Sequence, residues 1–304
     1  MAGERELTKL VIENVRDFDP ACIFGSGQCF RFSRARGGGY AGVVRGCFVN
    51  IIYDNEEDIL TIWSDYMPKS SEAFRLRFWR DYLDLDRDYK EIKRALSDSD
   101  PVMEKAILAC GGLRVLNQEP WETLISFIIS QNSNIPRIRG CIEQICARFG
   151  EKIGCFEERD LYAFPTIGAL AGADSRDLEL CKLGYRALYV AETARKVDVD
   201  GGAFLSAAHK ADAAKVLEYL LSLSGVGPKV AHCVMLFSMK KSDVFPIDVW
   251  IARAMNRLYG IPEDDHEAMR ALARERFAPW GGIAQMFLFE YIRRVRHNET
   301  RRDR

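Results

Sequence analysis

The sequence lacks the features of membrane and secreted proteins. No apolar run reaches the ~18 residues that cross a bilayer, and the first residues carry no apolar signal-peptide core. Nine cysteines occur without a C-x-x-C pair, and this odd number favours reduced, mostly buried thiols over a disulfide framework. We therefore expect a protein of the cytoplasm or nucleoid, or of the nucleus in a eukaryote, and not a secreted one.

An excess of one charge and the common cofactor motifs are also absent. The formal net charge of −1 is weak evidence against nonspecific coating of nucleic acid. Helix N-termini and backbone amides can still hold phosphates. The chain has no dinucleotide-binding glycine fingerprint, no P-loop and no cluster of metal ligands. We expect no organic cofactor and no catalytic metal, and little favours an enzyme that acts on small molecules.

Length and pattern indicate the domain organisation. The 304 residues, 48% hydrophobic and 29% charged, fit two globular domains better than one. Alternating apolar and polar positions over residues 7–65 predict an antiparallel sheet, and the pattern becomes helical from about residue 100. We predict an α+β protein with a twisted antiparallel-sheet domain at 1–99 and a helical domain at 100–304. The predicted strands cover residues 40–44, 47–53 and 59–63.

Helix signals recur in the second part of the chain. Pro120 opens a helix that is apolar almost all round and is therefore expected to be buried. Turn formers at 131–134 interrupt it, and the next helix ends at Gly150. The further predicted helices cover residues 211–223, 229–238, 248–259 and 282–296, with Gly260 after the third. The basic C-terminal end fits a solvated tail as well as a phosphate contact. Its arginines are Arg293, Arg294, Arg296, Arg301, Arg302 and Arg304.

A glycine-containing segment before Lys229 suggests a phosphate site. Residues 223–229 read Leu-Ser-Gly-Val-Gly-Pro-Lys, which predicts a tight hairpin between two helices. Gly225 and Gly227 suit positive φ angles and close approach, so the amides of Gly225, Val226 and Gly227 can bind a backbone phosphate. The Gly-x-Gly pattern alone fits a plain helix–helix turn about equally well. The Pro-Lys that follows favours the binding site.

Lys229 and Asp248 together suggest amine chemistry. Lys229 starts a helix, where the positive end of the helix dipole disfavours an ammonium and lowers the lysine pKa. A neutral amine can attack a sugar carbon and form an imine. Most lysines are merely solvated, and Asp248 could be only a helix N-cap, a role worth about 1 kcal/mol. A capping carboxylate can also stabilise the positive charge that builds on a sugar as its glycosidic bond breaks.

With these residues and others, the chain resembles the 8-oxoguanine DNA glycosylase/AP lyase family of helix-hairpin-helix glycosylases. The resemblance covers most of the chain and rests on five motifs that occur in the family's order. The motifs are Gly-Ser-Gly-Gln-Cys-Phe-Arg at 25–31, Ser-Gln-Asn-Ser-Asn-Ile-Pro-Arg-Ile at 130–138, Leu-Gly-Tyr-Arg-Ala at 183–187, Lys229 with Asp248, and Gln285 with Phe289.

The resemblance implies a bifunctional enzyme that flips 8-oxoguanine out of duplex DNA from opposite cytosine, acting as a monomer. Lys229 would displace the base at C1′ and then cut the strand by β-elimination, with Asp248 as the carboxylate. The site would lie in a cleft between the domains. The Gly27 carbonyl would accept a hydrogen bond from N7–H, which guanine lacks, and Gln285 would read the Watson–Crick edge. A structural cation at the hairpin carbonyls stays open.

Further residues are implied around the base and its former partner. Phe289 and Cys233, each one helical turn from a named site residue, would stack on the two sides of the flipped base, and core packing is the simpler alternative for both. Tyr185 would wedge into the stack, although for this residue alone half-buried packing is the better expectation. The residues implied to hold the orphaned cytosine are Asn132, Arg137 and Arg186.

Three positions depart from the family pattern. Ser133 replaces an amide in the Asn-rich loop, and Trp250 stands where eukaryotic members carry a histidine that contacts phosphate. Both departures allow a looser opposite-base preference. His232 stands where an Asp is common, and we expect it to be solvated on the surface.

Four alternatives compete with this interpretation. No cysteine follows Cys233, which argues against the iron–sulfur cluster of the endonuclease III branch, and Lys229 argues against the alkyl-base branch. A non-catalytic helix-hairpin-helix DNA-binding module needs only the glycine hairpin and leaves Asp248, Gln285 and Phe289 without a role. A helix-hairpin-helix glycosylase with a different base specificity stays open.

Overall fold

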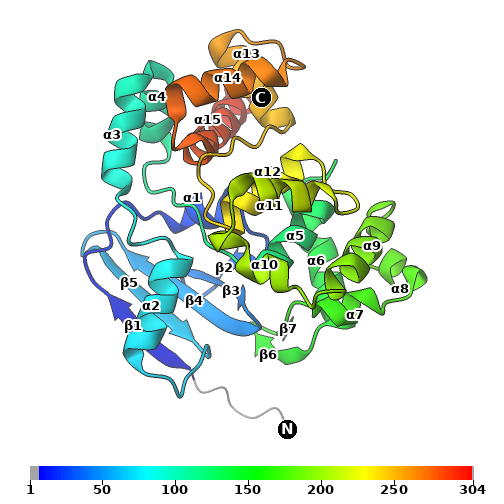
Figure 1. The fold of residues 1–304 in the computed structure, drawn as a ribbon. Coiled ribbons are helices and arrows are strands. Elements are labelled where there is room, and N and C mark those ends of the chain that lie inside the picture. The colour runs from blue at the N-terminus through cyan, green and yellow to red at the C-terminus, as the bar shows by residue number, and fades with distance from the viewer. Residues whose placement is uncertain (1–6, 303–304) are drawn as a thin grey trace.

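A computed structural model describes residues 7–302. A five-stranded antiparallel sheet lies at one end of the molecule, and helices form the rest (Figure 1). Within the described residues, no helix combines the length and apolar character needed to cross a bilayer. The predicted α+β fold is therefore confirmed.

The main sheet has the strand order β1-β5-β4-β3-β2, with every neighbouring pair antiparallel. The three predicted strands are confirmed as β3, β4 and β5, and two short strands complete the sheet. A separate hairpin, which the sequence analysis missed, is formed by β6 and β7. The strands are β1 (Thr8–Ile12), β2 (Phe32–Arg34), β3 (Tyr40–Val44), β4 (Cys47–Asp54), β5 (Ile59–Ser64), β6 (Lys152–Phe156) and β7 (Arg159–Tyr162).

Strand alternation gives the sheet one face in the main core and a second face that is exposed over part of its area. Ile51 and Ile62 are fully buried, whereas their neighbours Ile52 and Trp63 are each 37% exposed. The buried face shares a core with two helices, α1 (Pro20–Gly25) and α2 (Glu72–Tyr82). Figure 1 shows α2 lying across the sheet. Helix α1 is a correction, because residues 7–65 were expected to form strands and turns only.

The helical part is built around α5, which is buried as predicted, with Leu124, Ile125 and Ile128 at 0% exposure. Its helices are α3 (Tyr89–Ser99), α4 (Pro101–Ala109), α5 (Pro120–Ile129), α6 (Ile135–Phe149), α7 (Ile167–Ala171), α8 (Ser175–Leu180), α9 (Arg186–Asp198), α10 (Ala203–Ala207), the 3-10 helix η1 (Ala208–Lys210), α11 (Ala213–Leu221), α12 (Pro228–Ser238), α13 (Val249–Tyr259), α14 (His266–Phe277) and α15 (Gly281–Arg302).

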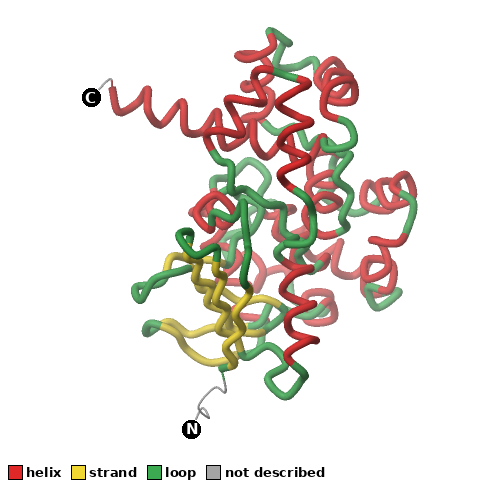
Figure 2. Tube along the Cα trace, turned by 90° about the vertical axis from the view of Figure 1, so that its left-hand side faces the viewer, coloured by secondary structure: helices red, strands yellow, loops and turns green. Residues whose placement is uncertain are grey.

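Two helices end at the glycine residues that predicted their ends. Gly150 follows α6, and Gly260 ends α13 in the left-handed conformation with φ of +70°. The C-terminal end of α15 extends away from the body of the protein (Figure 2). Of the predicted basic tail, Arg304 and the side chains of Arg301 and Arg302 lie outside the described residues.

The two parts of the chain share extensive contacts. Buried Arg31 of the sheet part forms ion pairs with Glu143 at 3.5 Å and Glu122 at 3.9 Å, both on helices of the helical part. Helix α3 precedes the predicted boundary at residue 100 and yet shares the core of the helical part. The boundary itself stays a prediction.

One cysteine expectation is wrong. Cys22 in α1 and Cys110 after α4 form a disulfide, with a Cα–Cα distance of 6.2 Å. Both residues are buried, and 88 positions separate them in the sequence. No local cysteine spacing therefore predicts this disulfide. The other seven cysteines are free, as expected.

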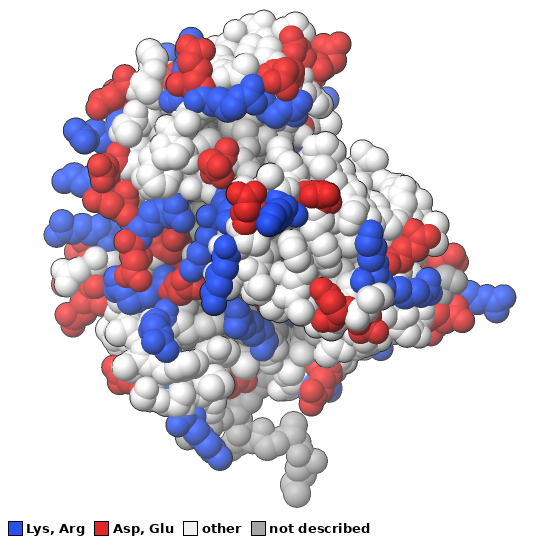
Figure 3. Space-filling view, in the orientation of Figure 1, with Lys and Arg blue, Asp and Glu red and all other residues white. Residues whose placement is uncertain are grey.

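Charged side chains are mixed on the face shown in Figure 3. Lysine and arginine lie among aspartate and glutamate there, and an extended area carries neither sign. This face therefore offers no broad surface of one charge, in agreement with the net charge of −1.

Candidate active site

Helix α12 places Lys229 in a half-buried position at the wall of a cavity. The segment between α11 and α12 forms the predicted hairpin, and Pro228 occupies the first position of α12. The Lys229 Nζ atom lies 3.4 Å from Ser130 Oγ and 5.0 Å from the centre of the Phe127 ring. Lys229 therefore points toward the C-terminal end of α5, and the surface-lysine alternative is wrong.

Asp248 is the N-cap of α13, as predicted. Its Oδ1 atom accepts a hydrogen bond of 2.8 Å from the Ile251 amide. In the part of the chain that the structure describes, no ion pair within 4.0 Å joins Asp248 to Lys229. The carboxylate is therefore free to act on a charge that develops between the two residues.

A small cavity of about 60 Å³ brings both residues together with the predicted base-binding set. Its walls come from the sheet part through Gly27 and from helices α5, α12 and α15, so the expected meeting of the two parts at this place is present. Sequence reasoning missed several wall residues. The lining consists of Ser26, Gly27, Phe127, Lys229, Cys233, Phe237, Pro246, Asp248, Gln285, Met286 and Phe289.

Gln285 contributes an unused acceptor to this cavity. Its side chain is 5% exposed, and its Oε1 atom has no hydrogen-bond partner. Leaving such an atom buried and unpaired costs about 1–3 kcal/mol, so this position is suited to a ligand that donates a hydrogen bond. Phe289 stands nearby at the rim, half-buried, with the Arg293 guanidinium 5.3 Å from its ring centre.

Cys233 presents a neutral thiol to the cavity. Burial raises the pKa of this thiol to about 11, and the nearby Lys229 lowers it only in part. The group therefore stays protonated near neutral pH, and it offers a polarizable surface, not an anionic nucleophile.

The loop that carries Gly27 is anchored by Gln28, whose role the sequence analysis missed. Gly27 has a φ of +77°, and Gln28 is fully buried. The Gln28 amide donates to the Ile23 carbonyl at 3.0 Å and to the Arg114 carbonyl at 2.9 Å, while its oxygen accepts from the Leu116 amide at 2.8 Å. Two of these partners, Arg114 and Leu116, lie more than 80 residues away, so no local pattern marks this role.

Of the two hairpin glycines expected to have positive φ angles, Gly225 does and Gly227 does not. Gly225 has a φ of +71°, and a Cβ atom there would lie 2.5 Å from the Tyr189 ring. Gly227 has a φ of −91° with nothing within 4 Å of an added Cβ, so it needs no glycine for its backbone. Only the first glycine is fixed by conformation, because the chain returns to extended geometry where it caps α12.

A second cluster forms beside the hairpin from the Asn-rich loop and the start of α9. Asn132 is exposed with a φ of +46°, and its Nδ2 atom donates to the Tyr185 hydroxyl at 3.1 Å. Tyr185 is 51% exposed, and its ring contacts Tyr189 edge-on at 5.8 Å. Tyr185 therefore combines packing against Tyr189 with an exposed edge, and its role as a wedge stays a prediction.

The two predicted arginines of this region have different surroundings. Arg186 is 5% exposed, and it donates to the backbone carbonyls of Gln131, Asn132 and Leu183. Its hydrogen bonds to these carbonyls therefore hold the Asn-rich loop in place. Arg137 is exposed in the first turn of α6. A contact of either arginine with cytosine stays a prediction.

His232 on α12 and Trp250 on α13, which depart from the family pattern, are both half-buried. His232 is half-buried beside a cavity of about 420 Å³ and not solvated as expected, because α12 packs against α11. Burial and the nearby Arg270 lower its pKa. Trp250 is also half-buried, and the Arg296 guanidinium lies 5.1 Å from its ring centre.

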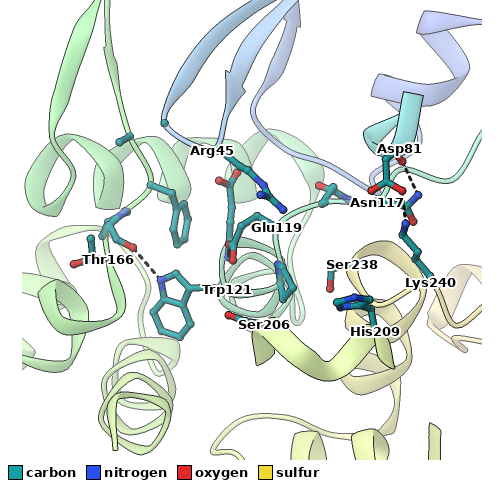
Figure 4. A pocket seen from close by; sticks show the side chains of 17 residues that line it. Arg45, Asp81, Asn117, Glu119, Trp121, Thr166, Ser206, His209, Ser238 and Lys240 are labelled. Carbon is teal, nitrogen blue, oxygen red and sulfur yellow. Dashed lines mark hydrogen bonds and ion pairs between the residues drawn. The ribbon is translucent and has the colours of Figure 1, made fainter. Parts of the chain in front are cut away.

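A larger cavity of about 680 Å³ lies at the opposite ends of α5 and α12 (Figure 4). Ser238, at its edge, is nine residues after Lys229, or roughly 14 Å along the helix. Several of the side chains that line this cavity are already paired, with Lys240 bonded to Asp81 and the Trp121 indole donating to the Pro165 carbonyl at 2.9 Å. The buried Gln285 oxygen without a hydrogen-bond partner lies in the small cavity together with Lys229 and Asp248.

Comparison with known proteins covers nearly the whole chain. Residues 10–124 match the family described as "8-oxoguanine DNA glycosylase, N-terminal domain", and residues 125–279 match "HhH-GPD superfamily base excision DNA repair protein". The "Probable N-glycosylase/DNA lyase" of Methanothermobacter thermautotrophicus is 31% identical, over 83% of this chain and 85% of that protein. The Saccharomyces cerevisiae "N-glycosylase/DNA lyase" is 35% identical over 68% of this chain, and the match spans 57% of the yeast protein.

A solved structure supports the same relationship. The Clostridium acetobutylicum 8-oxoguanine glycosylase/lyase, in complex with double-stranded DNA containing cytosine opposite 8-oxoguanine, superposes with a TM-score of 0.86. The two sequences are 35% identical, and the superposition covers 96% of this chain and 98% of the other. The similarity therefore includes both the sheet and the helical part.

Proposed function

This chain belongs to the 8-oxoguanine DNA glycosylase family of HhH-GPD base excision DNA repair proteins, and on that premise we propose a bifunctional glycosylase and lyase. It removes 8-oxoguanine paired with cytosine and then cuts the strand at the abasic site. The observation that carries this proposal is the common cavity of Lys229, Asp248 and Gln285. Such an enzyme works where DNA is stored, in a nucleoid or nucleus.

The first chemical step uses Lys229 and Asp248. The Lys229 nitrogen attacks C1′ of the flipped nucleotide, and the bond from C1′ to the base breaks with its electron pair on the base. Asp248 stabilises the positive charge that the sugar carries as this bond breaks. The half-buried position of Lys229 and the absence of an Asp248–Lys229 ion pair among the described residues support these roles.

The second step uses the bond between Lys229 and the sugar. Opening of the sugar ring gives an imine at C1′, which acidifies the neighbouring C2′ hydrogen. Removal of that proton expels the 3′ phosphate by β-elimination, and water then hydrolyses the imine to release Lys229. No atom of Lys229 is consumed, so the enzyme turns over.

Base selection rests on the walls of the cavity. The Gly27 carbonyl accepts from N7–H of 8-oxoguanine, and the unpaired Gln285 oxygen accepts a donor on the Watson–Crick edge. Ligand sites usually measure about 300–1,000 Å³, so entry of a base requires the cavity of about 60 Å³ to widen. Phe289 at the rim is placed to move and to stack on the base.

DNA is held beside the cavity by the hairpin and the Asn-rich loop. The amides of residues 225–227 and the start of α12 bind a phosphate, while Tyr185 enters the base stack and Asn132 faces the orphaned cytosine. The exposure of Tyr185 and the hydrogen bond between these two side chains support this role.

A base-release assay tests the substrate. Duplexes with 8-oxoguanine opposite cytosine, adenine, guanine or thymine are incubated with excess enzyme, and the freed base is measured by chromatography. We expect the fastest release opposite cytosine. Release of a different modified base, with none of 8-oxoguanine, would favour a glycosylase of other specificity. DNA binding without any released base would favour a non-catalytic binding module.

A further inference from the structure

Three consecutive side chains at the end of α5 contact three parts of the proposed site. Ser130 contacts the Lys229 amine at 3.4 Å, Gln131 donates to the Gly225 carbonyl at 2.9 Å, and Asn132 donates to the Tyr185 hydroxyl at 3.1 Å. The latter two link the hairpin to the exposed wedge. Ser130 is therefore fixed in place by contacts on its C-terminal side as well as by the helix before it.

The hydrogen bonds of Ser130 fix the direction of its hydroxyl. The Ser130 Oγ donates its single proton to the Phe127 carbonyl at 2.8 Å. Because that proton is used, Oγ can present only a lone pair to the Lys229 Nζ atom, and Lys229 has to be the donor. When the Lys229 amine is neutral and donates one N–H to Ser130, the nitrogen lone pair points along another tetrahedral direction, away from Ser130.

The other neighbours of Lys229 are weaker partners for its N–H groups. Among the described residues, Ser130 Oγ is the one oxygen within hydrogen-bonding distance of Nζ. The Phe127 ring lies 5.0 Å away and supplies an electron-rich face that attracts a cation without a fixed N–H direction. The Cys233 thiol also lies within hydrogen-bonding range of the Lys229 amine. It is protonated near neutral pH, and neutral sulfur is a weak acceptor, so the Ser130 oxygen is the stronger partner.

We propose that Ser130 is a positioning residue that holds one N–H of Lys229 and thereby aims the amine lone pair at C1′. This inference rests on the proposed lysine chemistry and adds a residue to it. Ser130 acts through Lys229 and touches no reacting atom of the substrate. Its effect therefore falls on the rate of bond formation and not on DNA affinity.

Covalent trapping on an abasic site tests the proposal. In the reaction, the Lys229 amine adds to the C1′ aldehyde, water leaves to give the imine, and borohydride reduces the imine to a stable amine. We expect Ser130→Ala to trap roughly five- to tenfold more slowly than wild type, the effect of one lost hydrogen bond. Affinity for a duplex with a tetrahydrofuran abasic analogue, which has no aldehyde, should stay unchanged. This titration also gives the competent fraction of each variant, to which the trapping rates are normalised.

Two further variants separate positioning from folding. Ser130→Thr keeps a hydroxyl that can bond both the Phe127 carbonyl and Lys229, so it should restore most of the rate. Ser238→Ala removes the same type of helix hydroxyl, which donates to the Val234 carbonyl at 2.6 Å, from the far end of α12. This control should trap like wild type.

The outcomes distinguish the two proposals. If wild type traps and Ser130→Ala traps at the same rate, the positioning role is overturned while the lysine chemistry stands. The role is also overturned if Ser130→Thr is as slow as Ser130→Ala, or if the loss lies entirely in the affinity for the tetrahydrofuran duplex. If wild type forms no covalent product, the proposed lysine chemistry fails, and the Ser130 proposal fails with it.

Discussion

A Cβ atom added to Gly27 would lie 3.2 Å from the Cδ1 atom of Ile135. Gly27 belongs to the sheet part of the chain, and Ile135 is the first residue of α6 in the helical part. With a φ of +77°, Gly27 also has a backbone conformation that other residues adopt at a cost of about 1–2 kcal/mol. The loop that faces the flipped base in the proposed site is therefore held by conformation and by contact together.

Gly27→Ala should reduce base excision more than strand cleavage. The added methyl group displaces the loop from Ile135, and misplacement by about 1 Å can cost up to roughly 100-fold in rate. Cleavage of a preformed abasic site needs no base recognition, so it should change less. Single-turnover rates on both duplexes give the comparison. Gly25→Ala is the control, because nothing lies within 4 Å of its added Cβ, and equal effects of the two variants would contradict the account.

Gly225→Ala should weaken DNA binding by about tenfold, whereas Gly227→Ala should bind nearly as well as wild type. The first substitution combines a positive φ with a 2.5 Å clash against the Tyr189 ring, and the second has neither problem. Fluorescence anisotropy with a labelled duplex at fixed salt measures both affinities. Greater damage from Gly227→Ala would show that the hairpin binds DNA in a different geometry.

Asp248→Asn should separate capping from catalysis. Asparagine caps helices about as well as aspartate, so the free energy of unfolding should change little, whereas Asp248→Ala should lose about 1 kcal/mol. Both variants remove the negative charge, and excision should fall roughly 100-fold or more. Denaturant melts and single-turnover excision measure the two effects. An active Asp248→Asn variant would reduce the residue to a helix cap.

His232 should make the protein less stable in acid. Burial and the positive charge of Arg270 lower its pKa from the ordinary value of 6.5. The unfolded chain binds the proton more readily than the folded protein. The contribution of neutral His232 to the free energy of unfolding is therefore present above about pH 6.5 and is lost as the pH falls. Between about pH 7.5 and pH 5.5, thermal melts should show a smaller decrease in Tm for His232→Gln than for wild type. Parallel decreases would contradict the prediction.

Local signals predicted much of the fold, because they depend on neighbouring residues. Strand alternation located β3, β4 and β5, and Gly260 was placed correctly as the end of α13. Helix α1 was missed although Asp19 caps it and Pro20 opens it. Gly25, the last residue of this short helix, and Gly27 after it are typical of a turn, and a six-residue helix is too short to display a period.

Site residues could be predicted where a local sequence motif marks them. They could not be predicted where their contacts join segments that are distant in the sequence. Lys229 and Asp248 were found because each stands at a helix start that the sequence marks. The burial of Arg186 and the anchoring role of Gln28 were not, since their partners are carbonyl groups of distant loops. The disulfide of Cys22 depends on the same long-range packing.

The most direct test of the account is borohydride trapping on a duplex with 8-oxoguanine opposite cytosine, with wild type and Lys229→Gln in parallel. The account predicts a covalent protein–DNA product with wild type and none with Lys229→Gln, while both proteins bind the duplex. A product of equal yield from Lys229→Gln would show that another amine is the nucleophile. Release of 8-oxoguanine by wild type without any product would show that water, not Lys229, displaces the base.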